Sequence, residues 1–261
     1  MDNAVKLPRA LFKSYARLKQ KKYRRLDRMF IVEGERSVLE ALRSDWEIEA
    51  LLFTERIRYS LNYSGFKYVA AYRISEQELS AISDTVSSQG VVAVVKEKQF
   101  PVENVWNNLA PHSILVGLDD VSDPGNVGTI IRTCDWFGAG AVLLGSSTVE
   151  LYNQKVIRST MGSLFHLPVI ADVDMPSILK EARSRNFSVI VAVVEDGTPL
   201  SEFSPPRRSL LVFGNEAHGV SPPVKNFADF RVTIPKYGNA ESLNVGVAVG
   251  IIMHHFCMSR E

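Results

Sequence analysis

The chain has 261 residues, of which 46% are hydrophobic and 23% are charged, with a formal net charge of +1. This is the composition of a folded globular protein, and it excludes disordered, collagen-like and low-complexity chains. No apolar run reaches the roughly 18 residues of a membrane span, and the basic N-terminus lacks the apolar core of a secretory signal. Two cysteines, Cys134 and Cys257, are too few for a disulfide framework or a four-ligand zinc site. We therefore expect buried, reduced thiols in a cytoplasmic protein.

Positive charge is concentrated at the start of the chain. Residues 1–28 contain ten lysines and arginines but two aspartates, whereas the remainder carries 20 basic and 27 acidic side chains. We expect residues 1–28 to form a basic arm that binds a polyanion; the alternative is a solvated helix that only aids solubility. Leu7, Leu11, Tyr15 and Leu18 recur at helical spacing, so part of the arm is expected to pack on the body.

A first α/β block follows at residues 29–97. Apolar runs predict strands at residues 29–32, 48–53 and 91–95, and helical spacing predicts a helix at 35–43. The sequence Ser75-Glu76-Gln77-Glu78 is a capping box that opens another short helix. Strands that alternate with helices favour a small, largely parallel sheet. Residues 98–112 contain two prolines and no clear periodicity, and we expect them to form a linker.

A second, larger α/β block occupies residues 113–261. Predicted strands lie at residues 113–118, 141–144, 187–194, 210–213 and 230–234, and predicted helices at 126–137, 156–164, 177–185 and 243–258. A turn at residues 119–125 and a loop at 235–241 each connect a strand to a helix. Such junctions are where α/β sheets place their ligands.

Polar residues gather at three of these junctions. In residues 118–133, a Pro-Gly turn leads into a helix that carries Asn126 and Arg132. The helix start would expose backbone N–H groups and a positive dipole end, although neither a dinucleotide fingerprint nor a P-loop is present. An ordinary tight turn with Asn126 as the N-cap explains the turn residues but leaves Arg132 unexplained.

The other two junctions follow later strands. Residues 213–222 place Glu216 between Gly214 and Gly219, where glycine permits close backbone approach to a ligand; the alternative is a simple turn with an exposed carboxylate. Residues 234–245 contain Ser242 and Asn244 beside a predicted helix start, so helix capping is the alternative role for each. Each junction alone is a weak signal.

Together and in this order, the three junctions resemble motifs 1, 2 and 3 of the SpoU (TrmH-type) RNA ribose 2′-O-methyltransferases, within the SPOUT superfamily. The sequence Arg158-Ser159-Thr160-Met161-Gly162 matches a stretch common between motifs 1 and 2. Residues 22–42 resemble the start of the family's substrate-binding domain. The resemblance covers the chain from about residue 22 to its C-terminus, and a chance match to three ordered motifs is improbable.

The resemblance implies a C-terminal SPOUT methyltransferase domain at residues 113–261, threaded into a deep trefoil knot, and a smaller L30e-like α/β RNA-binding domain at 29–97. It also implies S-adenosylmethionine as the cofactor, ribosomal or transfer RNA as the substrate, and a homodimer through the knotted domain. The implied cofactor-binding positions are Gly214, Ile234 and Leu243. The implied catalytic positions are Asn126, Arg132, Glu216, Ser242 and Asn244.

Physical chemistry makes these roles sensible. A sulfonium methyl group is already electrophilic, so no metal is expected, and the enzyme must position a ribose 2′-oxygen and accept its proton. A guanidinium is charged at neutral pH, so we favour Arg132 as a clamp on the RNA phosphate and the 2′-oxygen, with the phosphate helping to take the proton. Arg132 as the formal base is the alternative. Glu216 is expected to fix Arg132 or to reach across the dimer, while Asn126 and Asn244 orient the same group.

One departure from the family pattern is Gly246, which stands where many relatives have serine after the Asn-Val of motif 3. It weakens any role assigned to a serine there, and it leaves the cofactor loop intact. Two other functions compete with the enzyme. A knotted RNA-binding protein without turnover is one, and the intact set of motif residues disfavours it. A nicotinamide-dependent oxidoreductase is the other, and it is disfavoured because the glycine fingerprint is missing.

Overall fold

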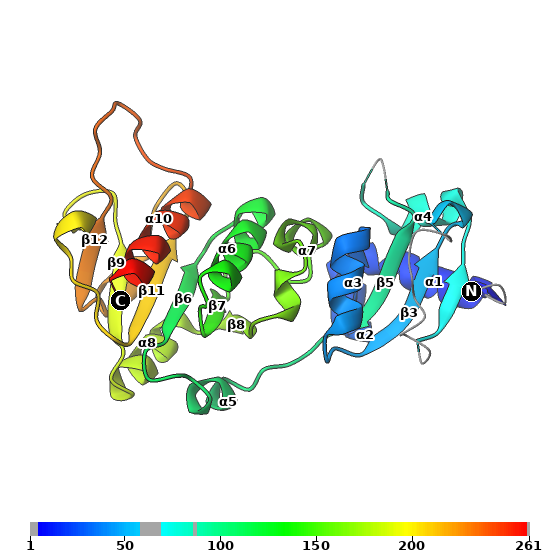
Figure 1. Ribbon diagram of the computed structural model, residues 1–261, viewed down its shortest axis with the longest axis horizontal. Helices are drawn as coiled ribbons and strands as arrows, with labels where there is room; N and C mark the ends of the chain where they lie inside the picture. The colour runs from blue at the N-terminus through cyan, green and yellow to red at the C-terminus, as the bar shows by residue number, and fades with distance from the viewer. Residues whose placement is uncertain (1–4, 58–68, 86–87, 260–261) are drawn as a thin grey trace. The chain divides into compact units, whose positions relative to one another are not determined.

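The computed structural model describes residues 5–57, 69–85 and 88–259, and the chain divides into two compact units. The N-terminal unit comprises Met1–Gln99 together with Tyr152–His166, a segment that we call the strap. The C-terminal unit comprises Phe100–Leu151 and Leu167–Glu261 (Figure 1). We expected every residue after 112 to belong to the second domain. Instead, the strap folds with the N-terminal unit.

The N-terminal unit is built on a five-stranded sheet with the order β1-β4-β3-β5-β2. Its strands are β1 (Val5–Lys6), β2 (Met29–Glu33), β3 (Ile48–Phe53), β4 (Ala71–Arg73) and β5 (Val91–Lys96). The sheet is mixed rather than largely parallel, because β5 runs antiparallel to both β2 and β3, while β3–β4 and β4–β1 are parallel pairs. Apolar runs of similar composition predict strands but carry no information on their direction.

The basic segment is an integral part of this unit from residue 5 onward; residues 1–4 lie outside the described residues. It forms β1, α1 (Arg9–Ala16), a 3₁₀ turn at Arg17–Lys19 and α2 (Lys21–Asp27). Leu7, Tyr15 and Leu18 are buried in the core with β-strand residues such as Ile31 and Leu52. Packing of the segment on the body, expected from its leucine spacing, is therefore confirmed. From Val5 to Arg28 the segment is folded against the unit rather than projecting from it.

The unit also contains the two predicted helices, α3 (Glu35–Arg43) and α4 (Glu76–Ile82). A 3₁₀ turn lies at Glu55–Ile57. Helix α4 begins with the predicted capping box. The Ser75 hydroxyl accepts from the Glu78 backbone N–H at 3.2 Å, and the Glu78 carboxylate accepts from the Ser75 N–H at 2.8 Å. Reciprocal bonds of this kind satisfy two backbone donors that the first turn leaves without a helical partner.

The strap consists of α7 (Gln154–Thr160) and a 3₁₀ turn at Ser163–Phe165. Its aromatic side chains pack on those of the unit: Tyr152 stacks on Phe30 with ring centroids 4.6 Å apart, and Phe165 meets Trp46 edge-on at 5.3 Å. The predicted helix at 156–164 is interrupted, because Met161 and Gly162 adopt positive φ angles of 52° and 100°. An added Cβ on Gly162 would lie 2.6 Å from the Glu40 side chain of α3, which explains the glycine.

An ion pair in the strap reaches the interior of the unit. Arg158 Nη1 lies 2.5 Å from Glu33 Oε1, and the Glu33 side chain is only 4% exposed. The hydroxyls of Ser83 and Thr85 donate to the other carboxylate oxygen. The Gln154 amide donates to the Ile82 carbonyl at 3.1 Å. Burying a carboxylate is costly unless it is paired and hydrogen-bonded, so the strap supplies the charge that makes Glu33 tolerable in this position.

The C-terminal unit is built on a seven-stranded sheet with the order β10-β12-β9-β11-β6-β7-β8, in which every pair is parallel. Its strands are β6 (Ile114–Asp119), β7 (Ala141–Gly145), β8 (Val169–Val173), β9 (Ser188–Ala192), β10 (Thr198–Pro199), β11 (Ser209–Gly214) and β12 (Phe230–Thr233). Strands β8 and β10 were not predicted from the sequence.

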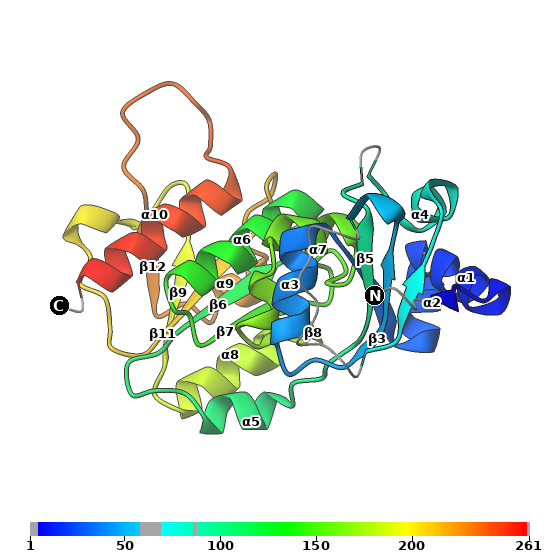
Figure 2. The same cartoon turned by 45° about the vertical axis from the view of Figure 1, so that its right-hand side comes forward.

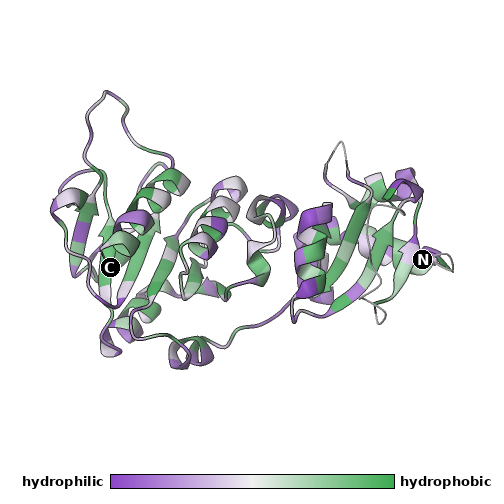
Figure 3. Ribbon diagram, in the orientation of Figure 1, coloured by the Kyte–Doolittle hydropathy of each residue, from purple (hydrophilic) through white to green (hydrophobic). Residues whose placement is uncertain are grey.

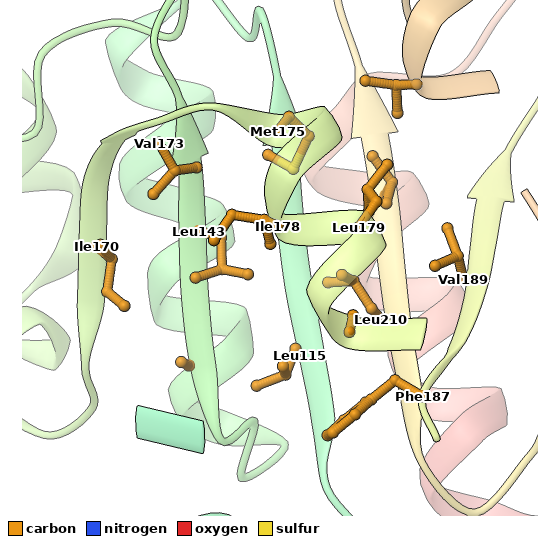
Figure 4. Close-up of a cluster of buried hydrophobic side chains, with 14 of the residues drawn as sticks. Leu115, Leu143, Ile170, Val173, Met175, Ile178, Leu179, Phe187, Val189 and Leu210 are labelled. Carbon is orange, nitrogen blue, oxygen red and sulfur yellow. The ribbon is translucent and has the colours of Figure 1, made fainter. Parts of the chain in front are cut away.

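Helices cover both faces of this sheet. Helices α6 (Pro124–Trp136) and α10 (Val245–Met258) lie together on one face, and α5 (Val102–Asn107) and α8 (Met175–Ser184) lie on the other (Figure 2). A short helix α9 (Pro222–Lys225) and a 3₁₀ turn at Leu200–Glu202 complete the unit. Figure 4 shows the core beneath α8, where Ile178 and Leu179 pack on Leu115, Leu143 and Leu210 of the strands.

Residues 98–112 were expected to form a linker, but part of this range folds as helix α5. Val105 and Trp106 are 7% and 5% exposed and belong to the core beneath α8, where the Trp106 ring lies 5.6 Å from that of Phe187. The three apolar residues of this six-residue helix span too short a stretch for a helical period to be recognised, so the sequence pattern missed an element that tertiary packing stabilises.

Apolar residues concentrate on the strands of both units (Figure 3). Among the described residues, no helix is both long enough and apolar enough to cross a bilayer. Cys134 is fully buried, which raises the pKa of its thiol, whereas Cys257 is half-buried rather than buried as expected.

Candidate functional site

The carboxyl ends of three parallel strands carry the predicted site residues. Strand β6 leads into residues 120–123, β11 into residues 215–221, and β12 into the open loop 234–244 that precedes α10 (Figure 1). Strands β6 and β11 are neighbours, yet the chain continues from β6 toward β7 on one side and from β11 toward β12 on the other. Such a switch point opens a crevice at the carboxyl edge of a sheet, where α/β proteins bind their ligands.

Asn126 does not cap α6, contrary to the simplest alternative considered above. Asp123 is the N-cap, and its carboxylate accepts from the Asn126 backbone N–H at 2.9 Å, with Pro124 in the first helical position. Aspartate before an N-terminal proline is a favoured helix start. Since the cap is provided by Asp123, the side chain of Asn126 is available for other contacts.

Asn126 connects the three junctions through its side-chain amide. Its Nδ2 donates to Glu216 Oε1 at 2.8 Å, and its Oδ1 accepts from Asn244 Nδ2 at 2.9 Å. The three residues come from α6, from the loop after β11 and from the start of α10, so residues up to 118 positions apart in sequence meet at one point. We call Asn126, Glu216 and Asn244 the amide–carboxylate triad.

Glu216 is held by donors from the loop after β6. The Ser122 N–H and hydroxyl both lie 3.4 Å from Oε2, and the Asp123 N–H lies 3.5 Å from Oε1. Partial burial by itself raises the pKa of Glu216, but the hydrogen bonds from Asn126 and from the loop outweigh it, so the pKa of Glu216 is lowered below its ordinary value. Glu216 is therefore a carboxylate at neutral pH and acts as an acceptor.

Asn244 performs two tasks at once. Its Oδ1 accepts from the Gly246 and Val247 N–H groups at 2.9 and 3.3 Å and so caps α10, while its Nδ2 donates into the triad. The capping role and the site role that the sequence left as alternatives are thus compatible. An added Cβ on Gly246 would come within 3.3 Å of Thr129 in α6, so glycine permits the two helices to pack closely at this point.

The loop after β11 folds tightly back on itself. Asn215 and Gly219 form a backbone bridge, and a Cβ added to Gly214 would lie 2.1 Å from the Gly219 carbonyl carbon. The Asn215 amide donates to the Asp120 carbonyl at 2.9 Å, and Asp119 Oδ2 accepts from the Ser221 N–H at 2.7 Å. These bonds fasten the loop to the end of β6, so the two backbone segments that border the crevice are rigidly joined.

Arg132 is exposed and lies apart from the triad. It is six residues beyond Asn126 on α6, a rise of about 9 Å. Within residues 5–57, 69–85 and 88–259 it makes no hydrogen bond or ion pair. The expected contact with Glu216 is not observed, because Asn126 and the β6 loop occupy that carboxylate. A free guanidinium beside a crevice suits an anionic ligand.

Ser242, Leu243 and Ile234 lie on the loop between β12 and α10 and are not brought into the triad. Ser242 and Leu243 are exposed, and the predicted start of α10 at residue 243 is wrong by two residues, since Asn244 is the cap. Ile234 is half-buried beside the end of β12. Within the part of the chain that is described, no three His, Cys, Asp or Glu side chains gather in the way that a metal ion requires.

Sequence reasoning missed four supporting residues: Asp119, Ser122, Asp123 and Asn215. Asp123 was recognisable, since a proline at the first helical position points to the residue before it as the N-cap. The other three act across strands β6 and β11, and their partners are about 95 to 100 positions away in sequence, so no local pattern marks them.

Known protein families match both parts of the chain. Residues 113–254 match the SpoU rRNA methylase family, and residues 10–93 match the MRM3-like substrate binding domain. The 23S rRNA (guanosine(2553)-2′-O)-methyltransferase RlmP of Bacillus subtilis is 35% identical over 93% of this chain and 94% of its own.

Two solved structures resemble the whole chain. A putative RNA methyltransferase of the TrmH family from Porphyromonas gingivalis has 30% identity and a TM-score of 0.84, covering 96% of this chain and 98% of its own. The AdoMet-bound rRNA methyltransferase from Sinorhizobium meliloti has 27% identity and a TM-score of 0.83, covering 97% and 96%. The resemblance therefore extends over both units.

Proposed function

The chain belongs to the SpoU rRNA methylase family, and we propose that it transfers a methyl group from S-adenosylmethionine to a ribose 2′-hydroxyl of RNA. The observation that carries this function is the triad. It joins residues of all three sequence motifs at the switch point of the parallel sheet, and the same helix as Asn126 carries Arg132, which has no partner in the part of the chain that the structure describes. A protein that had lost turnover would have no need to keep this polar network intact.

The residues at the crevice fit S-adenosylmethionine. The tight Gly214–Gly219 turn and the loop 234–244 offer backbone donors and acceptors at the carboxyl edge of the sheet, while Ile234 and Leu243 offer apolar surface. Gly214, Ile234 and Leu243 would hold the cofactor, which supplies an electrophilic methyl group when bound. The methyltransferase of Sinorhizobium meliloti, similar over the whole chain, is described as AdoMet-bound, which supports this choice.

We assign Arg132 to the RNA, where its guanidinium holds the phosphate and the 2′-oxygen of the target nucleotide. Since a guanidinium stays charged at neutral pH, the phosphate helps to take the proton; Arg132 as the formal base is the alternative. Asn126 and Asn244 fix the N-terminal ends of α6 and α10 relative to Glu216, and so set the helix on which Arg132 stands. Ser242 contributes a hydroxyl from the loop 234–244. Positioning of this kind accounts for much of the acceleration in reactions between two bound substrates.

The substrate is ribosomal RNA rather than transfer RNA in this proposal. The Bacillus subtilis relative, which matches 93% of this chain, is named for a guanosine of 23S rRNA, and the family itself is described by rRNA. Requirement for a 2′-hydroxyl distinguishes RNA from DNA at the site. The relative comes from Bacillus subtilis, whose ribosomes are in the cytoplasm, and we place this protein there as well.

A homodimer is the proposed assembly, with the knotted topology of the family in each copy. On α6 and α10, which pack together, Trp136, Val247 and Ile251 are 84%, 52% and 38% exposed. Large apolar side chains on adjoining helices favour a protein interface. Sedimentation should therefore give a dimer for the wild type and a monomer for Trp136→Glu.

The test of the activity uses the purified protein, radiolabelled S-adenosylmethionine and ribosomal RNA from cells that lack this gene. We expect label in a ribose 2′-O-methyl nucleotide of 23S rRNA, found by nuclease digestion, and none with the RNA of cells that keep the gene. Label on a base, or no label with any RNA, would refute the proposal.

A further inference from the structure

We propose that the N-terminal unit binds an unpaired nucleotide of the RNA substrate in a cleft between α1, β4 and the start of α4, an inference that rests on the proposed function. The cleft has a volume of about 540 Å³, within the range of about 300–1,000 Å³ typical of small-ligand sites. Its lining combines an aromatic ring with cations and short polar side chains: Lys6, Phe12, Glu55, Arg73, Ile74, Ser75, Gln77 and Glu78.

Lys6, which lines the cleft, and two cations of α1, the helix that carries Phe12, have no anionic partner among the described residues. Lys6 of β1 and Arg9 and Lys13 of α1 are exposed, and within the described ranges none of them makes a side-chain hydrogen bond or ion pair. Lys6 stands opposite Arg73 in the parallel β1–β4 pair. Glu55 pairs with Arg73, so Lys6 is the cation of this strand pair that an RNA phosphate would neutralise.

The carboxylates of the cleft are already engaged. Glu55 accepts from Arg73 Nη1 at 2.9 Å, and Glu78 accepts from the N–H and hydroxyl of Ser75 in the capping box. Arg73 therefore neutralises Glu55, whereas Glu78 accepts from neutral donors and keeps its negative charge. Over the lining, Lys6 and Arg73 balance Glu55 and Glu78, so the excess positive charge available to a phosphate is that of Arg9 and Lys13 on α1, the helix that carries Phe12.

Phe12 gives the cleft a stacking surface. It is half-buried, since one part of its ring packs on the core of the unit while another lines the cleft. Stacking of bases on aromatic rings is the usual means by which proteins hold unpaired nucleotides, and it tolerates any base. Gln77 and Ser75 place amide and hydroxyl groups at the same opening, where base edges would meet them.

The segment that carries these groups is held in place rather than free. Leu7 and Tyr15 are buried, and the Leu7 N–H donates to the Arg73 carbonyl at 3.2 Å. Arg24, itself 3% exposed, donates to the Leu18 and Lys19 carbonyls at 2.8 Å and fixes the turn between α1 and α2. Binding would therefore require little ordering of the protein, which favours affinity.

The test measures binding of the full-length protein to a short oligouridylate and to a blunt RNA duplex of the same length, across a range of salt concentrations. We expect the oligouridylate to bind more tightly, and Phe12→Leu to weaken it about tenfold with the salt dependence unchanged. Phe12→Tyr, which keeps an aromatic ring, should retain wild-type affinity. Lys6→Gln should reduce the slope of log K against log salt by about 0.7, and Lys180→Gln on α8, the control, should leave it unchanged.

Equal affinity of Phe12→Leu, Phe12→Tyr and the wild type, at matched thermal stability, would overturn the inference, as would equal effects on duplex and oligouridylate. The methylation assay separates the two proposals. If the wild type methylates ribosomal RNA while Phe12→Leu does not change RNA binding, the proposed nucleotide site is refuted and the proposed activity is supported. If no RNA is methylated while Phe12→Leu still weakens RNA binding, the proposed activity is refuted and the proposed nucleotide site is supported.

Discussion

Removal of the Arg158 charge should destabilise the N-terminal unit through Glu33. In Arg158→Met, the apolar stem of the side chain is retained and the buried carboxylate loses its cation. Breaking a fully buried ion pair costs about 3–5 kcal/mol. Here Ser83 and Thr85 continue to donate to Glu33, and the Arg158 side chain is 38% exposed, so we expect a smaller loss of about 2–3 kcal/mol.

Urea unfolding, followed by circular dichroism and tryptophan fluorescence, measures this change in the free energy of unfolding. Lys155→Met, an exposed position on the same helix, is the matched control and should stay within about 0.5 kcal/mol of the wild type. The double variant Glu33→Gln/Arg158→Met should recover at least about 1 kcal/mol relative to Arg158→Met, because a neutral amide is cheaper to bury than an unpaired carboxylate. A loss no larger than that of the control, or a double variant less stable than Arg158→Met, would refute the reasoning.

Three further predictions concern the site. Arg132→Ala should abolish methyl transfer and leave S-adenosylmethionine affinity nearly unchanged in calorimetry; a tenfold loss of cofactor affinity with preserved turnover would contradict its assignment to the RNA. Gly214→Ala should reduce cofactor affinity at least about tenfold in calorimetry, because its Cβ would lie 2.1 Å from the Gly219 backbone; unchanged affinity would contradict the place given to this turn. Asn126→Ala should lose less than about 1 kcal/mol of stability at pH 7, since Glu216 is exposed and screened. Glu216 has a lowered pKa in the folded state, so its contribution is present above its ordinary pKa and is lost as the pH falls through the folded value; the difference between wild type and variant should vanish in acid unfolding curves, and a difference that grows in acid would contradict this.

The sequence predicted the elements and junctions of the C-terminal unit well, because parallel strands buried on both faces are long apolar runs and their carboxyl ends collect polar residues. Each residue of the amide–carboxylate triad was chosen from a separate motif, and the structure places Asn126 within hydrogen-bond distance of both Glu216 and Asn244. Within one copy of the chain Glu216 contacts Asn126 rather than Arg132, because that choice depends on side-chain direction, and its alternative role across a dimer stays a prediction. Motif spacing carries no information about that direction.

Errors elsewhere arose where tertiary packing overrides local pattern. Helix α5 is too short to show a period, and its Trp106 is recognised as a core residue only from its contact with Phe187. The strap was predicted as a helix, yet its membership of the N-terminal unit depends on partners such as Glu33, which precedes Arg158 by 125 positions. The prediction of a largely parallel N-terminal sheet was wrong for the same reason, because β5 pairs in the antiparallel direction with strands far from it in sequence.

The strap also bears on how the protein is made. The ribosome synthesises the chain from its N-terminus, so residues 1–99 emerge well before Tyr152–His166. The N-terminal unit therefore cannot complete its fold until residue 166 has been synthesised. During that interval Phe30, Trp46 and Glu33 lack the side chains that cover or neutralise them in the finished protein. A fragment ending at residue 99 would remain in that unfinished state permanently, and should aggregate or recruit chaperones unless the strap peptide is supplied in trans.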